Sequence, residues 1–249
     1  MKRLALLILP LIAAHAQNIR VVKFSESEPF RMGEVTSRRI IHPGIGAKKT
    51  TLNLSVSRNG AEFAQHVHDY SDDTILVLNG EVNLRQGDEF HLFKTGEVAF
   101  VPTGQIHGTI TAGTGDTTMI SFQNPPDLIL YTGARDSKKA GNAPPKGDIT
   151  PGAVKYVRFD KSNGEFTNAA LGSKRATGSR YLLEKGKKFK TIVKSDGEQV
   201  LFVWRGSIRV NDGTKSYTAG ERDTVFIQGS AKLEVVADSL SEIIQVQAP

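Results

Sequence analysis

The chain has 249 residues, of which 39% are hydrophobic and 7% aromatic, and its formal net charge is +6. It contains no cysteine, which excludes disulfides, thiolate metal ligands, a thiol nucleophile and a lipid-modified N-terminal cysteine. The basic residues are scattered in small clusters without interleaved aromatic residues, so no nucleic-acid partner is expected.

The first sixteen residues have the pattern of a secretory signal peptide. Lys2 and Arg3 precede an apolar stretch over residues 4–14, and Ala14-His15-Ala16 has the small-x-small form of a cleavage site. The apolar stretch is too short for the ~20 residues that a membrane-spanning helix needs. We therefore predict an exported protein, secreted or periplasmic, without a membrane anchor, whose mature chain starts near Gln17.

The rest of the chain has the pattern of an all-β protein. Short runs rich in Val, Ile, Leu, Thr and Phe alternate with Gly, Asn and Asp, as at residues 51–57, 74–78, 97–101 and 117–122. Asn59-Gly60 and Asn79-Gly80 separate apolar runs, and Asn-Gly in this position is typical of β-hairpins. Many short strands at this spacing predict a barrel or sandwich.

The chain also repeats itself. Three glycines of the first half have counterparts in the second half, offset by 126, 126 and 124 residues, at Gly60 and Gly186, Gly80 and Gly206, and Gly96 and Gly220. Residues 21–24 likewise resemble residues 156–159. We interpret this as a duplicated β-domain. The predicted boundaries are 17–131 and 155–249, with a polar linker rich in Gly and Pro at 132–154.

Three histidines and one carboxylate stand out in the first copy. His66 and His68 are two residues apart, and alternate residues of a strand point to the same side. Asp73 begins the next apolar run, and His107 follows a later one. Imidazoles with one carboxylate suit a divalent transition metal and leave positions open for water, oxygen or substrate.

These residues carry a resemblance to the cupin superfamily, and specifically to a two-domain bicupin. The family motifs are G-x5-H-x-H-x(3,4)-E-x6-G and G-x5-P-x-G-x2-H-x3-N, and this chain matches them at all but two positions. The motif positions are Gly60, His66, His68, Asp73, Gly80, Gly96, Pro102, Gly104, His107 and Thr111. The resemblance implies two tandem cupin barrels (double-stranded β-helix, or jelly roll) and a metal site of His66, His68, Asp73 and His107.

The two departures from the motifs are Asp73, where the family usually has Glu, and Thr111, where it has Asn. Asp is one methylene shorter than Glu, so three roles stay open for Asp73: direct ligation, ligation through water, or orientation of a histidine. Asp72 is the alternative carboxylate, but its distance to Gly80 is one residue too long.

The second copy lacks these ligands. Ile192, Lys194, Gln199 and Ala231 stand at the positions of the three histidines and the acid, and Glu198 is one position out of register. We therefore expect the C-terminal domain to be structural. The alternative is a metal-free ligand pocket that uses Lys194 and Trp204.

The resemblance implies a metal-dependent enzyme on a small organic molecule, of the dioxygenase, isomerase or lyase type, with Fe, Mn, Ni or Zn as the metal. Asp69 and Tyr70, directly after the paired histidines, are the candidates for acid–base roles. The alternatives are an exported protein that binds a sugar or carboxylate without catalysis, and a structural or oligomeric protein. A homodimer is one expectation, since cupins often pair through their sheets.

Overall fold

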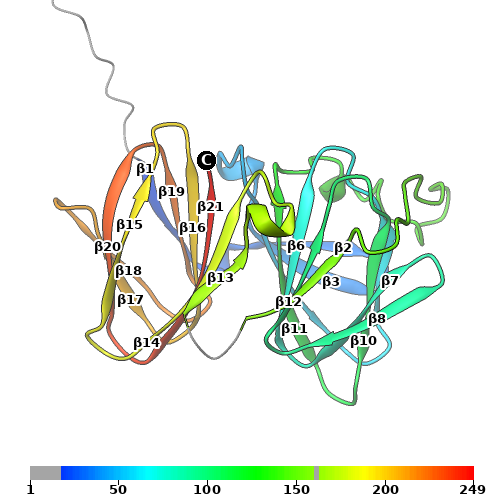
Figure 1. Ribbon diagram of the computed structural model, residues 1–249, viewed down its shortest axis with the longest axis horizontal. Coiled ribbons are helices and arrows are strands. Elements are labelled where there is room, and N and C mark those ends of the chain that lie inside the picture. The colour runs from blue at the N-terminus through cyan, green and yellow to red at the C-terminus, as the bar shows by residue number, and fades with distance from the viewer. Residues whose placement is uncertain (1–17, 160–162) are drawn as a thin grey trace, which may run out of the picture.

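The computed structural model describes residues 18–159 and 163–249, and it contains two β-barrel domains that lie side by side (Figure 1). The predicted signal peptide lies outside the described residues. Each domain is built from one large and one small antiparallel sheet. In the part of the chain that is described, no helix is long and apolar enough to cross a membrane.

The N-terminal domain combines a sheet ordered β12-β9-β6-β11-β4-β3-β2 with a sheet ordered β5-β10-β7-β8. Its strands are β2 (Glu28–Met32), β3 (Val35–Ile41), β4 (Leu52–Ser57), β5 (Glu62–His66), β6 (Asp72–Asn79), β7 (Glu81–Gln86), β8 (Glu89–Lys94), β9 (Glu97–Val101), β10 (His107–Ala112), β11 (Thr117–Asn124) and β12 (Lys155–Arg158). Three 3₁₀ turns accompany them: η1 (Phe24–Glu26), η2 (Pro43–Ile45) and η3 (Leu130–Thr132).

The C-terminal domain repeats this arrangement, with a sheet ordered β1-β19-β16-β21-β14-β13 and a sheet ordered β15-β20-β17-β18. Its strands are β1 (Asn18–Val22), β13 (Gly164–Thr167), β14 (Thr177–Leu183), β15 (Lys188–Val193), β16 (Glu198–Arg205), β17 (Ile208–Asn211), β18 (Ser216–Ala219), β19 (Thr224–Gln228), β20 (Ala231–Ala237) and β21 (Ser241–Ala248). The 3₁₀ turn η4 (Ala169–Leu171) stands where η2 stands in the first copy. The prediction of two tandem jelly-roll barrels is confirmed.

The leading strand of each copy lies in the sheet of the other domain. Strand β1 pairs with β19 of the C-terminal domain, and β12 pairs with β9 of the N-terminal domain. The predicted boundaries 17–131 and 155–249 place β1 in the N-terminal domain and β12 in the C-terminal domain, whereas each strand lies in a sheet of the other domain. The exchange ties the domains together through backbone hydrogen bonds as well as side-chain packing.

The two Asn-Gly turns do not form the hairpins that the sequence suggests. Asn79-Gly80 joins β6 to β7 and Asn59-Gly60 lies between β4 and β5, and in both cases the two strands belong to different sheets. Glycine is needed at position 80 because its φ is +89° and a Cβ there would lie 2.4 Å from the Thr117 hydroxyl. The chain uses this turn to cross from one sheet to the other.

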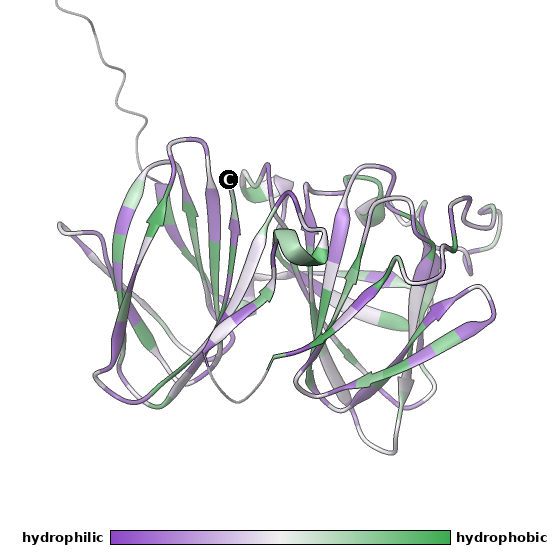
Figure 2. Cartoon of the chain, in the orientation of Figure 1, coloured by the Kyte–Doolittle hydropathy of each residue, from purple (hydrophilic) through white to green (hydrophobic). Residues whose placement is uncertain are grey.

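Side chains of the large sheets alternate between two cores. In β6, Ile75 and Val77 face the interior of the N-terminal barrel, whereas Leu76 and Leu78 face the second domain. The core between the domains also contains Phe202 and Trp204 of β16, so Trp204 is a core residue. Figure 2 shows hydrophobic residues interspersed with polar ones along the strands, as expected for sheets with two different faces.

The predicted linker packs on the N-terminal barrel. The main chain of Asp148 bridges Gly104 and Ile106 through hydrogen bonds of 2.8 Å each, and the Gln105 side chain is bonded to Thr150. Gly147 lies so close to the barrel that a Cβ would meet the Gly104 carbonyl at 2.6 Å. The segment therefore covers the barrel next to the strand that carries His107.

Candidate metal centre

The four predicted ligands converge at one end of the N-terminal barrel. His66 is the last residue of β5, Asp73 the second residue of β6 and His107 the first residue of β10, while His68 lies just beyond β5. All four side chains are buried. Their ligand atoms lie within 4.8 Å of one another, an arrangement that could hold a metal ion.

A backbone irregularity brings His107 beside His66. The two residues are paired across β10 and β5, and the register shifts immediately after them, before Thr109. Gly108 permits this approach, because a Cβ there would lie 2.8 Å from the Phe63 carbonyl oxygen. Bulges of this kind re-aim side chains next to functional sites.

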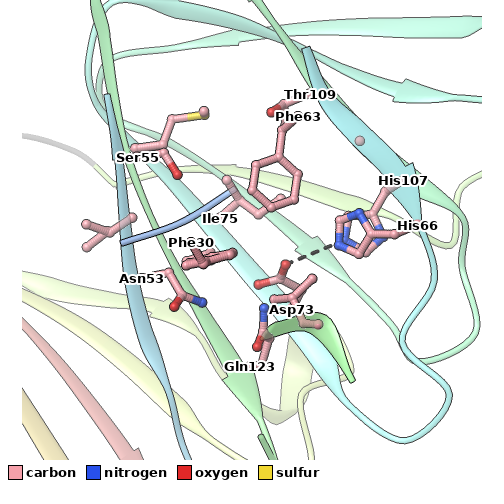
Figure 3. Close-up of a pocket in the computed structure, with 15 residues that line it drawn as sticks. Phe30, Asn53, Ser55, Phe63, His66, Asp73, Ile75, His107, Thr109 and Gln123 are labelled. Atoms are coloured by element: carbon pink, nitrogen blue, oxygen red, sulfur yellow. Dashed lines mark ion pairs between the residues drawn. The ribbon is translucent and has the colours of Figure 1, made fainter. Parts of the chain in front are cut away.

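The inward-facing atoms are close enough to share one ion. His66 Nε2 lies 3.2 Å from His68 Nε2. The Asp73 carboxylate oxygen Oδ2 lies 3.7 Å from His68 Nε2 and 3.5 Å from His107 Nε2. Figure 3 shows Asp73 facing the histidines, with the ion pair to His107 dashed.

A hydrogen bond at Nδ1 orients each of the three imidazoles. The Nδ1 of His66 lies 2.9 Å from the Ala64 carbonyl, and that of His107 lies 3.0 Å from the Gln105 carbonyl. The Nδ1 of His68 lies 2.7 Å from the Asp127 carboxylate. Because a carbonyl or carboxylate accepts the Nδ1 proton, each Nε2 is left with its lone pair directed inward, as in metal-bound histidines.

The protonation states also suit a cation. Burial lowers the pKa of His66, and the neighbouring His107 and His68 lower it further. Burial works against the charged forms of His68 and Asp73 as well. The hydrogen bond to Asp127 and the nearby Asp73 carboxylate nevertheless raise the pKa of His68, and the adjacent His107 and His68 imidazoles hold the pKa of Asp73 well below its usual range. The ionised Asp73 carboxylate beside the neutral His66 imidazole is what a divalent cation requires.

Two side-chain atoms of the cluster have no hydrogen-bond partner among the described residues. They are Asp73 Oδ1 and His107 Nε2, and both are buried. Such orphaned atoms are costly without a compensating ligand. The cluster therefore fits a divalent transition metal by its donor set, its burial and its unmet bonding capacity.

Asp127 is the functional residue that sequence reasoning missed. Besides holding His68, its carboxylate accepts hydrogen bonds from Arg135 Nε at 3.1 Å and from the Ile129 main chain at 2.9 Å. These bonds outweigh the effect of burial, and the pKa of Asp127 falls to about 2. Asp127 lies in the loop after β11 and belongs to no motif, so no local pattern marks it.

The two candidates for acid–base roles lie outside the cluster. Tyr70 is 79% exposed at the surface. Asp69 forms an ion pair of 2.8 Å with Arg135, which in turn contacts Asp127. Asp69 is therefore connected to His68 only through two intervening side chains, and neither candidate lines the cavity beside the cluster.

That cavity has a volume of about 30 Å³ and lies on the side of the cluster formed by His66, Asp73 and His107. Phe30 of β2 and Leu130 of η3 line one side of it, and the Phe30 ring packs edge-on against Tyr131 with the ring centres 5.2 Å apart. The remaining lining residues are Asn53, Ser55, Phe63, Ile75, Gly108, Thr109, Met119, Ile120, Ser121 and Gln123.

The second copy has a hydrogen-bond network where the first has ligands. Gln199, in the place of Asp73, accepts hydrogen bonds from Thr191 at 2.9 Å, Gln245 at 3.0 Å and Gln247 at 2.8 Å. Ile192, which the sequence aligns with His66, is 63% exposed, and the buried Ala231 pairs with Val193 instead. The only cluster of metal-binding side chains in the described ranges 18–159 and 163–249 is the one in the N-terminal domain.

The family model of the cupin domain matches residues 54–122, which include all four residues of the cluster. The N-terminal barrel therefore contains a cupin domain. The two-barrel fold as a whole is matched by solved structures over 93% and 91% of the chain. Among curated proteins the chain is similar to protein SchB of Streptomyces halstedii, with 24% identity over 54% of this chain and 98% of that protein.

The solved structures with this fold include a nickel(II) complex and two enzymes. YhhW from Escherichia coli matches with a TM-score of 0.72 at 19% identity, over 93% of this chain and 98% of that chain. The same protein, described as a bacterial pirin, has a structure in complex with nickel(II). A Bacillus subtilis oxalate decarboxylase variant matches at 12% identity with a TM-score of 0.67, over 91% of this chain and 76% of that one.

A variant of salicylate 1,2-dioxygenase from Pseudoaminobacter salicylatoxidans, in complex with gentisate, also matches, with 12% identity and a TM-score of 0.67 over 96% of this chain and 84% of that one. At these identities the likeness shows the fold, and reaction and substrate do not follow from it.

Proposed function

We propose that the N-terminal cupin binds a divalent first-row transition metal through His66, His68, Asp73 and His107 and is an enzyme that acts on a small organic molecule. The observation that carries the proposal is the convergence of four buried ligand atoms within 4.8 Å. Support comes from the neighbours that bind nickel(II) or have Mn(II) centres, and Fe and Zn suit the same donor set.

The lining of the cavity favours oxygen chemistry over isomerase or lyase chemistry. A bound metal there would polarise an oxygen-bearing substrate and, if redox-active, would also engage oxygen. Apart from His66, Asp73 and His107, the described residues that line the cavity are apolar, amide, hydroxyl or glycine residues. Isomerases and lyases need a separate acid or base within reach of the substrate, and this cavity offers none besides the ligands.

The chain's own residues supply position and exclusion of water. His66, Asp73 and His107 line the cavity, whereas His68 does not, so a substrate would approach the metal from the side of these three ligands. Phe30, Phe63 and Leu130 give that side an apolar lining, which would displace water from around a bound substrate. The alternative, an exported protein that binds a sugar or carboxylate, gains less support, because no Lys or Arg lines the cavity to pair with a carboxylate.

The first test is metal content. Protein purified without chelator would be compared with a His66→Ala/His68→Ala variant and with His91→Ala, whose histidine stacks on Tyr156 outside the cluster. We expect about one equivalent of metal in the wild type and in His91→Ala, and little in the double variant. Equal metal content in all three proteins would contradict the site.

The second test addresses the reaction. Fe(II)-loaded protein would be assayed for oxygen uptake with catechols, flavonols and diketones. Uptake that disappears in the double histidine variant supports the oxygenase assignment, and a fully loaded protein without uptake would leave the binding function favoured. We also propose export through residues 1–16, supported by their signal-peptide pattern. A mature N-terminus at Met1 in the exporting cell would contradict it.

A further inference from the structure

Unsatisfied polar atoms are concentrated in the cavity beside the cluster. Nine buried side-chain atoms in the described part of the chain lack a hydrogen-bond partner, and three of them belong to residues that line this cavity. Two are Asp73 Oδ1 and His107 Nε2, which a metal would satisfy. The third is Asn53 Nδ2, an amide nitrogen whose two protons make it a donor and not a metal ligand.

Asn53 is held so that this nitrogen stays available. The residue lies in β4, between Arg39 of β3 and Ser121 of β11, and it is only 3% exposed. The Tyr131 hydroxyl donates a hydrogen bond of 3.1 Å to Asn53 Oδ1. With the oxygen engaged by this donor, Nδ2 is the atom of the amide that is left without a partner.

Tyr131 is itself well fixed as a donor. Its ring packs edge-on against Phe30 and lies under the Arg39 guanidinium, whose central carbon is 5.5 Å from the ring centre. Burial raises its pKa to about 12, so the phenol keeps its proton throughout the neutral range. Figure 3 shows Asn53 on the wall across the cavity from His66 and His107, with Asp73 between them, which places a donor opposite the two histidines.

The lining also limits the charge of a ligand. Apart from Asp73 and the two histidines, every described residue that lines the cavity is neutral, and half a dozen of them are apolar: Phe30, Phe63, Ile75, Met119, Ile120 and Leu130. A second ionised group on a ligand would be buried without a counter-charge, which is costly. A carbonyl or hydroxyl oxygen facing Asn53 would instead satisfy a donor that is otherwise unmet.

We propose that Asn53 donates a hydrogen bond from Nδ2 to a carbonyl or hydroxyl oxygen of the substrate, and that this substrate is a compact oxygen-chelating molecule with an apolar body and no more than one ionised group. The inference rests on the proposed function, because the substrate's other oxygens face the metal. It sets Asn53 apart from the ligands as a residue that positions the substrate and selects for an oxygen acceptor.

The test uses Co(II)-loaded protein, whose visible absorption reports changes at the metal, with pentane-2,4-dione and oxalate as probes. Asn53→Leu removes the donor at nearly constant size, and Asn53→Asp replaces the donor with an acceptor. Asn83→Leu is the matched control, because Asn83 lies on β7 between the inward-facing Val82 and Leu84 and does not line the cavity.

We expect the diketone to bind wild-type protein more tightly than oxalate does. Its Kd should rise about tenfold in both Asn53 variants, as expected for one lost hydrogen bond, with cobalt content unchanged and Asn83→Leu unaffected. Equal diketone affinity in wild type and in Asn53→Leu would overturn the role of Asn53, and tighter binding of oxalate would overturn the substrate class. Failure of the wild type to bind cobalt would instead refute the proposed function.

A second variant keeps the test decisive if the Asn53 substitutions disturb folding. Tyr131→Phe leaves Asn53 in place but removes the hydroxyl that fixes its amide. Diketone affinity should fall while cobalt content stays the same, because Tyr131 contacts neither the cluster nor the substrate. Unchanged diketone affinity in correctly folded Tyr131→Phe would contradict the inferred orientation of Asn53.

Discussion

Arg175 of the C-terminal domain contacts strand β6, which carries Asp73, and the loop that leads to His107. Its Nη1 donates to Asp72 Oδ1 at 3.0 Å and to the Thr103 hydroxyl at 2.7 Å. Asp72 immediately precedes Asp73, and Thr103 lies on the segment that leads to His107. We therefore predict that replacing Arg175 with Met weakens metal binding, although Arg175 lies in the domain without ligands.

The size of the effect follows from the exposure of the pair. A charge-assisted hydrogen bond contributes about 1.5–3 kcal/mol when buried, but the Arg175 side chain is 42% exposed, and exposed ion pairs contribute about 0.2–1 kcal/mol. We take about 1 kcal/mol as the free energy by which Arg175 holds Asp72 and Thr103 in place. If the free energy of metal binding decreases by this full amount, the Kd for metal rises about fivefold.

The second domain provides a matched control. Lys49 stands 175 − 49 = 126 residues before Arg175, at the equivalent position of the first copy, and its Nζ contacts Asp196 at 3.3 Å and the Pro249 carbonyl at 2.8 Å. Lys49→Met also removes one cation from the contact between the domains, but its contacts lie in the barrel without ligands. Both variants should lower thermal stability slightly.

The assay is competition for Zn²⁺ or Co²⁺ against a chromophoric chelator, with thermal unfolding measured in parallel. We expect the metal Kd to rise about fivefold in Arg175→Met, following the exposed-pair estimate of about 1 kcal/mol, and to change less than about twofold in Lys49→Met. Equal metal affinities for wild type and Arg175→Met would show that the reasoning is wrong. Equal losses in both variants would show that general loosening of the two domains explains the effect.

Two further predictions concern the surroundings of the cluster. Asp127→Asn should weaken metal binding about 10- to 100-fold, which is the usual effect of losing the partner that orients a histidine ligand. The control is Asp136→Asn, because Asp136 is also a buried carboxylate but accepts a hydrogen bond from the Gly33 main chain, and its loss should leave metal binding unchanged. Comparable losses of metal affinity in the two variants would argue against the role of Asp127. For Tyr131, the pKa of about 12 lies above its ordinary value, so the neutral phenol stabilises the fold fully below pH 10, and this contribution is lost as the pH rises through 12. The unfolding free energy of wild type relative to Tyr131→Phe should therefore fall by about 1 kcal/mol between pH 9 and pH 11 in urea titrations, and a constant difference would contradict the burial of the phenol.

Strand spacing, together with the resemblance to the cupin motifs, predicted the four residues that the structure brings together in the cluster. His66 and His68 share a face because they are two residues apart, and Asp73 shares its parity with the buried Ile75 and Val77. These are local properties of single strands, and sequence reveals them directly. The duplicated glycines likewise predicted the two barrels.

The missed features all depend on contacts between distant segments. Asp127 reaches His68 across 59 residues, and Asn53 meets Tyr131 across 78. The Asn-Gly turns carry the correct backbone requirement, but a dipeptide does not specify which sheet the next strand joins. The polar composition of residues 132–154 resembles a linker because a segment that covers a barrel rim still exposes most of its side chains.

Asp72 and Glu198 directly precede Asp73 and Gln199 in the two copies. Their contacts explain how the second copy can lack a metal cluster and still keep its fold. Glu198, the equivalent of Asp72, accepts hydrogen bonds from the main chain of Lys48, Lys49 and Thr50 at 2.8, 2.9 and 3.2 Å. Each acid thus binds the equivalent loop of the opposite domain, Glu198 through main-chain atoms and Asp72 through the Arg175 side chain. Because neighbouring residues of a strand face opposite sides, the contact between domains and the interior of the barrel occupy adjacent positions. Gln199 can therefore replace a ligand by a neutral network without disturbing Glu198, and Asp73 can hold its ligand position while Asp72 receives Arg175.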